Sequence, residues 1–180
     1  MRASLRTELL DRAYLDADRR ALLDLDPSNR DAGWNSGQLD FFLAQERAGF
    51  RVIAHRTETA TPIAFYAIKH HQGALFISNL MVARRWRRQG IGSFAMDRIV
   101  RIASKLECER VTIEVQERNL AAQLLCQAHG FRATEISPRQ FSSQDGYRME
   151  RRLDGDPGRI LGNVDRDAAE QRQSGKPFGP

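Results

Sequence analysis

The amino-acid sequence predicts an α/β fold, with a mixed central sheet and helices on both of its faces. Hydrophobic residues make up 41% and charged residues 28% of the 180 residues, which is typical of a globular domain. An apolar run at residues 74–82, the helical pattern after it and an alternating run at residues 111–115 form a β–α–β unit, whose crossover joins parallel strands. The extended runs on either side of this unit are linked by short turns, which indicates antiparallel neighbours.

The N-terminal part of the chain is expected to form one strand and two helices, at residues 3–7, 10–26 and 35–48. Pro27 ends the first helix, because proline cannot continue a helical hydrogen-bond ladder. Asn35 or Ser36 caps the second helix, and Gly49 stops it. Three extended runs follow, at residues 51–56, 62–69 and 74–82, and the last two are joined by a turn at residues 70–73.

The C-terminal part of the domain begins with the most regular helical pattern, at residues 92–106. Its apolar side chains recur every three or four residues, at Ala95, Ile99, Ile102, Ala103 and Leu106. After the strand at residues 111–115, Asn119 caps a further helix that ends at His129 and Gly130. Two strands, at residues 131–137 and 147–153, complete the sheet.

Length and composition limit the domain organisation. A chain of 180 residues suits one compact domain, which we place at residues 1–153. Residues 154–180 hold five of the 13 glycines and three of the six prolines, but only six apolar residues among 27. Such a segment buries little apolar area, so we expect a flexible tail.

Several classes of protein are disfavoured by the same composition. With only Cys108 and Cys126, no disulfide framework is expected and a reducing cytoplasm fits best. No apolar run approaches the roughly 18 residues of a membrane span, and charged residues interrupt the N-terminus where a signal peptide would be apolar. The cysteines and the four histidines show no metal-ligand spacing, so no metal is expected.

A basic loop between the first parallel strand and its helix is the most informative local motif. Six arginines lie between residues 84 and 101, against Asp97 alone. Within this segment, Gly90 and Gly92 permit a tight turn and the close approach of a ligand. The helix that starts here presents unpaired N–H groups and the positive end of its dipole. The loop therefore predicts a diphosphate site, with a glycine-containing turn before an ordinary basic helix as the alternative.

The pattern Arg87-x-x-Gly90-x-Gly92 resembles the R/Q-x-x-G-x-G/A signature of the GNAT superfamily of acyl-CoA-dependent N-acetyltransferases. The resemblance covers about residues 3–153 in the same element order. It includes the strand at residues 74–82, Val111-Thr-Ile-Glu114-Val115 and Asn119-x-x-Ala122…His129-Gly130-Phe131. Trp34-Asn-Ser and Tyr147-x-Met149-x-x-x-Leu153 are most similar to the ribosomal-protein N-terminal-alanine acetyltransferase group.

The resemblance implies a GNAT-like sheet whose parallel strands splay apart, with acetyl-CoA as co-substrate between them. The main chain of the preceding strand would pair with the pantetheine arm, at Leu80, Met81 and Val82. The loop that follows would hold the pyrophosphate, at Arg87, Arg88, Gln89, Gly90, Ile91, Gly92 and Ser93. Asn119 would contact the pantetheine arm from the other side. Ser93 departs from the relatives, which often have a basic residue there.

Glu114 is the candidate general base for transfer of an acetyl group to an amine. Val111, Ile113 and Val115 share one strand face, so Glu114 points to the other. The resemblance matches Glu114 to the base position of the N-terminal acetyltransferases, and a partly neutral α-amine needs only a positioned carboxylate. The alternative is an exposed carboxylate that pairs with a neighbouring arginine.

Cys126 occupies the position at which the relatives carry a proton-donating tyrosine. Helical periodicity predicts a core stripe of Ala121, Leu124, Leu125 and Ala128, and a second face, directed toward the cofactor, of Asn119, Ala122, Cys126 and His129. Cys126 is therefore either a proton donor to the leaving thiolate or a small side chain that makes room for coenzyme A, and the second role is favoured.

The sequence thus predicts a cytoplasmic, acetyl-CoA-dependent N-acetyltransferase. The expected acceptor is an α-amine at a protein or peptide N-terminus. Alternatives are a small-molecule amine acceptor, a catalytically silent acyl-CoA-binding module, and an RNA-binding protein that uses the arginines but lacks an RNP-type motif. We expect no membrane partner and disfavour nucleic acid, while a homodimer stays open.

Overall fold

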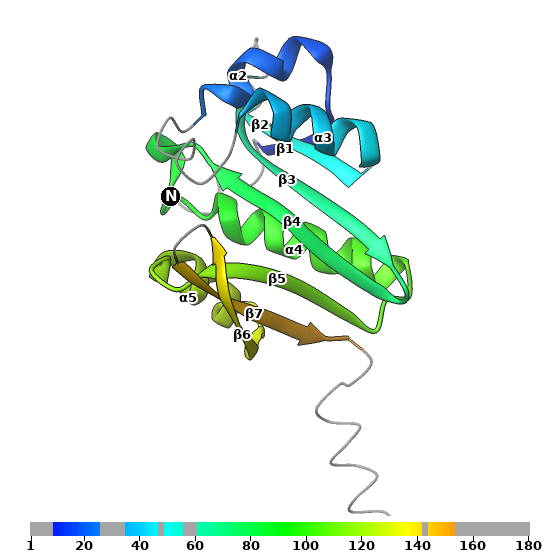
Figure 1. Ribbon diagram of the computed structural model, residues 1–180. Helices are drawn as coiled ribbons and strands as arrows, with labels where there is room; N and C mark the ends of the chain where they lie inside the picture. The colour runs from blue at the N-terminus through cyan, green and yellow to red at the C-terminus, as the bar shows by residue number, and fades with distance from the viewer. Residues whose placement is uncertain (1–8, 26–34, 47–48, 56–60, 142–143, 154–180) are drawn as a thin grey trace, which may run out of the picture.

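The computed structural model describes residues 9–25, 35–46, 49–55, 61–141 and 144–153. Seven strands form one sheet in the order β1-β2-β3-β4-β5-β7-β6. These strands are β1 (Leu9–Ala13), β2 (Phe50–His55), β3 (Pro62–His71), β4 (Ala74–Val82), β5 (Arg110–Gln116), β6 (Arg132–Phe141) and β7 (Gln144–Arg152). The helices are α2 (Arg19–Leu23), α3 (Ser36–Glu46), α4 (Ile91–Lys105) and α5 (Leu120–Ala128), with short 3-10 turns at Asp16–Asp18 and Arg84–Trp86. Within the described ranges, β4 and β5 are the only strands that pair in parallel, so the predicted mixed sheet is confirmed (Figure 1).

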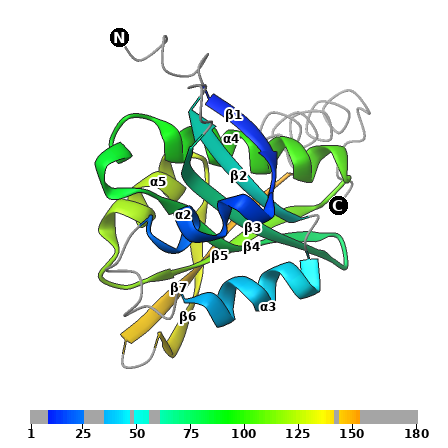
Figure 2. The ribbon, with the colours of Figure 1, turned by 90° about the horizontal axis from the view of Figure 1, so that it is seen from above.

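Helices pack on both faces of the sheet, as expected (Figure 2). The buried apolar side chains form two cores, one on each face. On one face, Met96 and Ile99 of α4 pack with Val111 of β5. On the other face, Leu39 of α3 lies in a second core with Phe65 of β3. Successive residues of each strand therefore serve different layers, because side chains alternate across a sheet.

The N-terminal region differs from the sequence prediction. The strand expected at residues 3–7 and Pro27 lie outside the described residues, and the helix expected at 10–26 begins instead as strand β1. Asp11 of β1 explains the difference, because it accepts hydrogen bonds from Arg51 Nε and Tyr66 Oη, each at 3.1 Å. These contacts and the antiparallel pairing with β2 outweigh the weak helical pattern. Of residues 10–25, the 3-10 turn at Asp16–Asp18 and α2 are helical.

The other predicted elements are found with small shifts at their ends. Asn35 Oδ1 accepts a hydrogen bond from the amide of Gln38 at 3.1 Å, which confirms the capping role at the start of α3. The turn expected at residues 70–73 is tighter than predicted, because β3 runs to His71. Only Gln72 and Gly73, with φ of 47° and 70°, connect β3 to β4.

Helix α4 turns a slightly different face to the core than its periodicity predicts. Ala95, Ile99 and Ala103 are buried as expected, but Leu106 caps the helix and is 47% exposed. The buried face is completed by Ile91 and Met96. The buried stripe thus begins and ends nearer the N-terminus of the helix than predicted.

The parallel pair separates after four residues. Ala74–Ile77 of β4 lie opposite residues 110–113 of β5, and beyond Ile77 the two strands have no pairing. Strand β4 continues to Val82 beside β3, with a bulge that leaves Ser78 without a register partner. The β5-facing edge of β4 is therefore free of a strand partner from Ser78 to Val82.

Candidate functional site

The N-terminus of α4 stands at the end of this free edge and is not capped by any side chain. Gly90 adopts φ +87°, a conformation that L residues rarely take, and a Cβ built on it has open space within 4 Å. The first helical hydrogen bond runs from Phe94 N to Gly90 O. The amides of Ile91, Gly92 and Ser93 precede that bond, so they and the helix dipole can bind an anion.

The missing side chain of Gly92 serves the packing of two helices. A Cβ on Gly92 would lie 3.1 Å from Leu125 Cδ2 of α5. Glycine here allows α4 and α5 to pack closely, whereas we had expected both glycines to serve ligand approach. The open approach belongs to Gly90 alone.

The arginines around this loop divide into two groups. Arg87 Nε donates a hydrogen bond to Val82 O at 3.0 Å, which fastens the loop to the end of β4, and Arg88 is exposed with φ 63°. Arg98 lies farther along α4, 3.7 Å from the Asp11 carboxylate and 5.3 Å from the Phe94 ring centre. The positive charge of residues 84–101 is thus only partly available to a ligand at the loop.

Side chains from the free edge of β4 pack into the cores on both faces of the sheet. Leu80 and Val82 pack against the α4 side, whereas Met81 is buried on the α3 side. Opposite them, Asn119 caps α5 by accepting a hydrogen bond from the amide of Ala122 at 3.1 Å, which confirms the predicted cap. The free edge of β4, the α4 N-terminus and the α5 N-terminus are the elements that flank the separating strands.

Glu114 lies on the sheet face opposite α4, as its strand alternation predicts. Its carboxylate accepts hydrogen bonds from Arg148 Nε at 2.9 Å and Ser137 Oγ at 3.2 Å. The bond to Glu114, together with a contact to Glu135, raises the pKa of the Arg148 guanidinium. The carboxylate is therefore held by two neighbouring strands, and the arginine pairing foreseen as the alternative is present.

Arg148 and Ser137 were not among the predicted site residues. Glu114 lies opposite Arg148 in the β5–β7 register, so both side chains leave the same face. Alternation within β7 places Arg148 opposite in direction to the buried Met149, but the sequence does not give the strand order β5-β7-β6. Without that strand order, Arg148 and Ser137 could not be predicted as neighbours of Glu114.

Cys126 is buried on the inward face of α5, and the predicted core stripe of this helix is wrong. Ala121, Leu124 and Ala128 are exposed, whereas Ala122, Leu125 and Cys126 face the protein. Cys126 is 1% exposed, and burial raises the pKa of its thiol to about 11. It is accordingly protonated at neutral pH and packed as a small apolar group.

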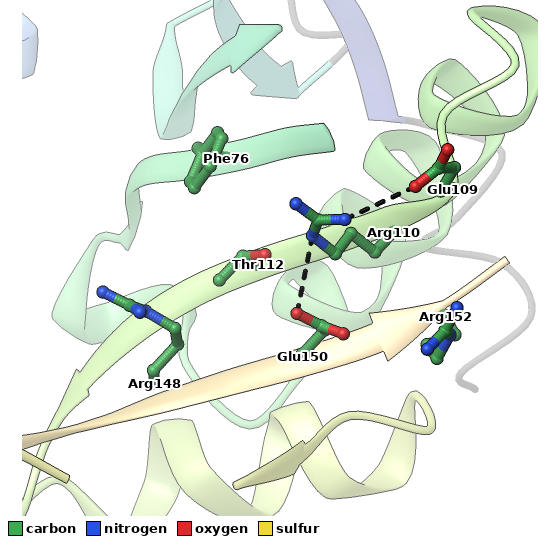
Figure 3. A pocket seen from close by; sticks show the side chains of 7 residues that line it. All are labelled: Phe76, Glu109, Arg110, Thr112, Arg148, Glu150 and Arg152. Atoms are coloured by element: carbon green, nitrogen blue, oxygen red, sulfur yellow. Dashed lines mark hydrogen bonds and ion pairs between the residues drawn. The ribbon is translucent and has the colours of Figure 1, made fainter. Parts of the chain in front are cut away.

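A hollow of about 570 Å³ lies over β4, β5 and β7 (Figure 3), on the sheet face to which Glu114 points. We call it the β5–β7 hollow, and its lining residues are Phe76, Glu109, Arg110, Thr112, Arg148, Glu150 and Arg152. Arg148 belongs both to the hollow and to the Glu114 ion pair. None of these seven residues was predicted to be functional, because they come together only through the register of β4, β5 and β7.

Two further features concern metals and membranes. Among the described residues, no three His, Cys, Asp or Glu side chains gather closely enough to hold a metal ion. In the same part of the chain, no helix is both long and apolar enough to cross a membrane.

Solved structures share this fold over most of the chain. Ard1 from Thermoplasma volcanium superposes with a TM-score of 0.74 and 20% identity, covering 81% of this chain and 98% of its own. The ribosomal-protein-S18-alanine N-acetyltransferase from Escherichia coli gives 0.65 and 17%, covering 82% and 97%. NAA60 from Arabidopsis thaliana, in complex with a bisubstrate analogue, gives 0.69 and 18%, covering 82% and 99%.

Sequence comparison identifies the family directly. No curated protein is similar enough in sequence to count as a match. The model of the acetyltransferase (GNAT) family, however, matches residues 12–131, which include the separating strands, the loop at 87–93 and Glu114. The chain belongs to the GNAT family and is an N-acetyltransferase.

Proposed function

We propose that the protein transfers the acetyl group of acetyl-CoA to the α-amine at the N-terminus of a protein or peptide. The observation that supports this most strongly is the separation of β4 and β5 beside the uncapped N-terminus of α4. An α-amine acceptor is favoured by the S18-alanine N-acetyltransferase among the similar structures. At 17% identity that likeness establishes the fold alone, so the acceptor is part of the proposal.

Residues of this chain fit acetyl-CoA at three places. The free edge of β4 at Leu80, Met81 and Val82 offers main-chain groups that can pair with the amides of a pantetheine arm. The loop from Arg88 through Gln89 and Gly90 to Ser93 offers main-chain amides to a diphosphate, and those of Ile91, Gly92 and Ser93 have no helical partner. The open space at Gly90 admits the diphosphate. Asn119 flanks the arm from α5. When bound, acetyl-CoA supplies an acetyl thioester.

Glu114 is the proposed proton acceptor. An α-amine has a pKa near 7.7–8.0, so part of it is already neutral at pH 7 and a carboxylate can take the remaining proton directly or through one water. The hydrogen bonds from Arg148 and Ser137 fix the orientation of the carboxylate on the face opposite α4. The acceptor would therefore approach from the face opposite the one on which α4 packs.

Cys126 is proposed to make room for the cofactor rather than to donate a proton. Its small, buried side chain stands where the relatives carry a larger tyrosine. The departing thiolate would then take its proton from water or from the attacking amine.

The decisive experiment is a mass-spectrometric assay of acetylation with acetyl-CoA. Peptides with a free α-amine are compared with the same peptides blocked at the N-terminus, and with polyamines, amino acids and amine antibiotics. We expect acetylation at the α-amine of the free peptides only. Turnover confined to small amines would favour the small-molecule alternative, and binding of acetyl-CoA without turnover of any amine would favour the silent module.

A further inference from the structure

The β5–β7 hollow shares Arg148 with the Glu114 ion pair. Arg148 lines the hollow and also donates a hydrogen bond to Glu114 at 2.9 Å. Thr112 is 4% exposed and lies between Phe76 of β4 and Glu150 of β7 in the strand register. Figure 3 shows the seven lining side chains grouped over the three strands. A ligand that reaches Glu114 from this side therefore passes over the hollow.

The dimensions of the hollow match a chain rather than a small amine. Thr112 and Arg110 precede Glu114 by two and four residues on the same strand face, which is about 7 and 13 Å at the rise of a strand. An extended peptide advances by about 3.3–3.6 Å per residue. With its α-amine at Glu114, an acceptor lying along β5 would place its third to fifth residues over the hollow.

The lining has the groups that a peptide segment needs. The Arg110 guanidinium is only loosely paired, with Glu109 Oε2 at 3.5 Å and Glu150 Oε2 at 3.6 Å, so its donors can turn to peptide carbonyls. The carboxylate of Glu150 can accept from peptide N–H groups. Phe76 is 38% exposed and offers an apolar surface to a side chain. A volume of about 570 Å³ accommodates a few residues.

We propose that the β5–β7 hollow is an extended acceptor subsite that binds the third to fifth residues of a polypeptide substrate. This inference rests on the acetyltransferase function proposed above and specifies its substrate class as a chain of at least about five residues. Small amines and dipeptides would react without help from the hollow.

The test measures kcat/KM against alanine-rich peptides of two to six residues, with free α-amines and amidated C-termini. Amidation matters because a terminal carboxylate would itself bind Arg110 or Arg148. Wild-type protein is compared with Arg110→Ala and Phe76→Ala, and with Arg20→Ala as a matched control, because Arg20 is 95% exposed on α2. The thermal shift with acetyl-CoA checks that each variant is folded.

We expect kcat/KM of the wild type and of Arg20→Ala to rise at least tenfold between two and five residues. Arg110→Ala and Phe76→Ala should lose most of that rise and retain the dipeptide rate. A wild-type rate that is independent of length, or variants that slow all lengths equally, would overturn the subsite. Failure of wild-type protein to acetylate any peptide would overturn the proposed function, and this inference with it.

Discussion

At the residue scale, the proposed role of Glu114 as proton acceptor is the easiest to test. We expect Glu114→Gln to lower kcat/KM at pH 7 by roughly 10²–10⁴, the usual contribution of a general base, and to leave acetyl-CoA binding intact. The loss should shrink at high pH, where the α-amine is already neutral. Steady-state rates from pH 6 to 10, with thermal shifts for binding, measure both effects.

Glu135→Gln is the matched control for this variant, because Glu135 also pairs with Arg148 but lies farther from the separating strands. If both variants lose the same activity, Glu114 only holds Arg148 in place. If Glu114→Gln keeps the full rate at pH 7, Glu114 has no part in proton transfer.

Cys126 gives a second prediction at the same scale. We expect Cys126→Ala to retain most of the activity, because the thiol is packed as an apolar group. Burial raises its pKa to about 11, so a proton-donating thiol would make the rate fall only as the pH approaches that value. Cys108→Ala, which removes the other buried thiol, serves as the control. A loss of tenfold or more in kcat for Cys126→Ala alone would identify the thiol as the acid.

Glu114 and Cys126 also illustrate which parts of the site could be predicted from the sequence. Strand alternation was enough to place Glu114 on the correct face, because Val111 and Val115 are both buried on the other. The stripe of α5 could not be placed in the same way. Leu124 and Leu125 are equally apolar, and only the packing of α4 through Gly92 decides that Leu125 faces inward.

At the scale of elements, the loop before α4 predicts how acetyl-CoA is bound. Gly90→Asp should abolish the thermal stabilisation by acetyl-CoA, because it places a carboxylate where a diphosphate meets the helix N-terminus. Gly90→Asn is the matched control, since asparagine has the same shape without the charge and tolerates the φ of +87°. We expect Gly90→Asn to keep most of the stabilisation, measured by thermal denaturation over a range of acetyl-CoA concentrations.

If acetyl-CoA stabilised both variants equally, the diphosphate would not be bound at this loop. Loss of stabilisation in both would mean that the glycine conformation, rather than charge, controls binding.

Helices and strands were predictable from the sequence where the local hydrophobic pattern agrees with the packing in the folded protein. Strand β4 and helix α4 lie within one residue of the bounds that their hydrophobic patterns predict, although the buried face of α4 is shifted. The turn between β3 and β4 is predictable from its glycine. Strand β1 was missed because its extended form depends on Asp11, whose partners Arg51 and Tyr66 are 40 and 55 residues away. The bulge at Ser78 has no local signal either.

At the scale of the whole molecule, the strand order β4-β5-β7-β6 brings two halves of the proposed site together, the cofactor-binding half and the acceptor-binding half. The parallel pair separates beside α4 on one face, while β6 and β7 bring Ser137 and Arg148 to Glu114 on the other. In the proposed arrangement, the cofactor and the acceptor approach from opposite faces and meet between the separating strands. Motifs in sequence predicted the first half, whereas the second depends on how the C-terminal hairpin inserts β7 next to β5.

The boundary of the domain gives the last prediction. Leu153 N donates a hydrogen bond to Glu109 O at 2.7 Å, so the main-chain pairing of β7 extends to the end of the predicted domain. Residues 154–180 lie outside the described residues and contain six apolar residues among 27. We expect deletion of residues 154–180 to change the free energy of unfolding by less than about 1 kcal/mol and to preserve acetyl-CoA binding, because so polar a segment can bury little apolar area. Urea unfolding of both chains measures the difference. A loss above about 2 kcal/mol would show instead that Ile160, Leu161 and Val164 pack on the domain, since burying two or three such side chains contributes that much.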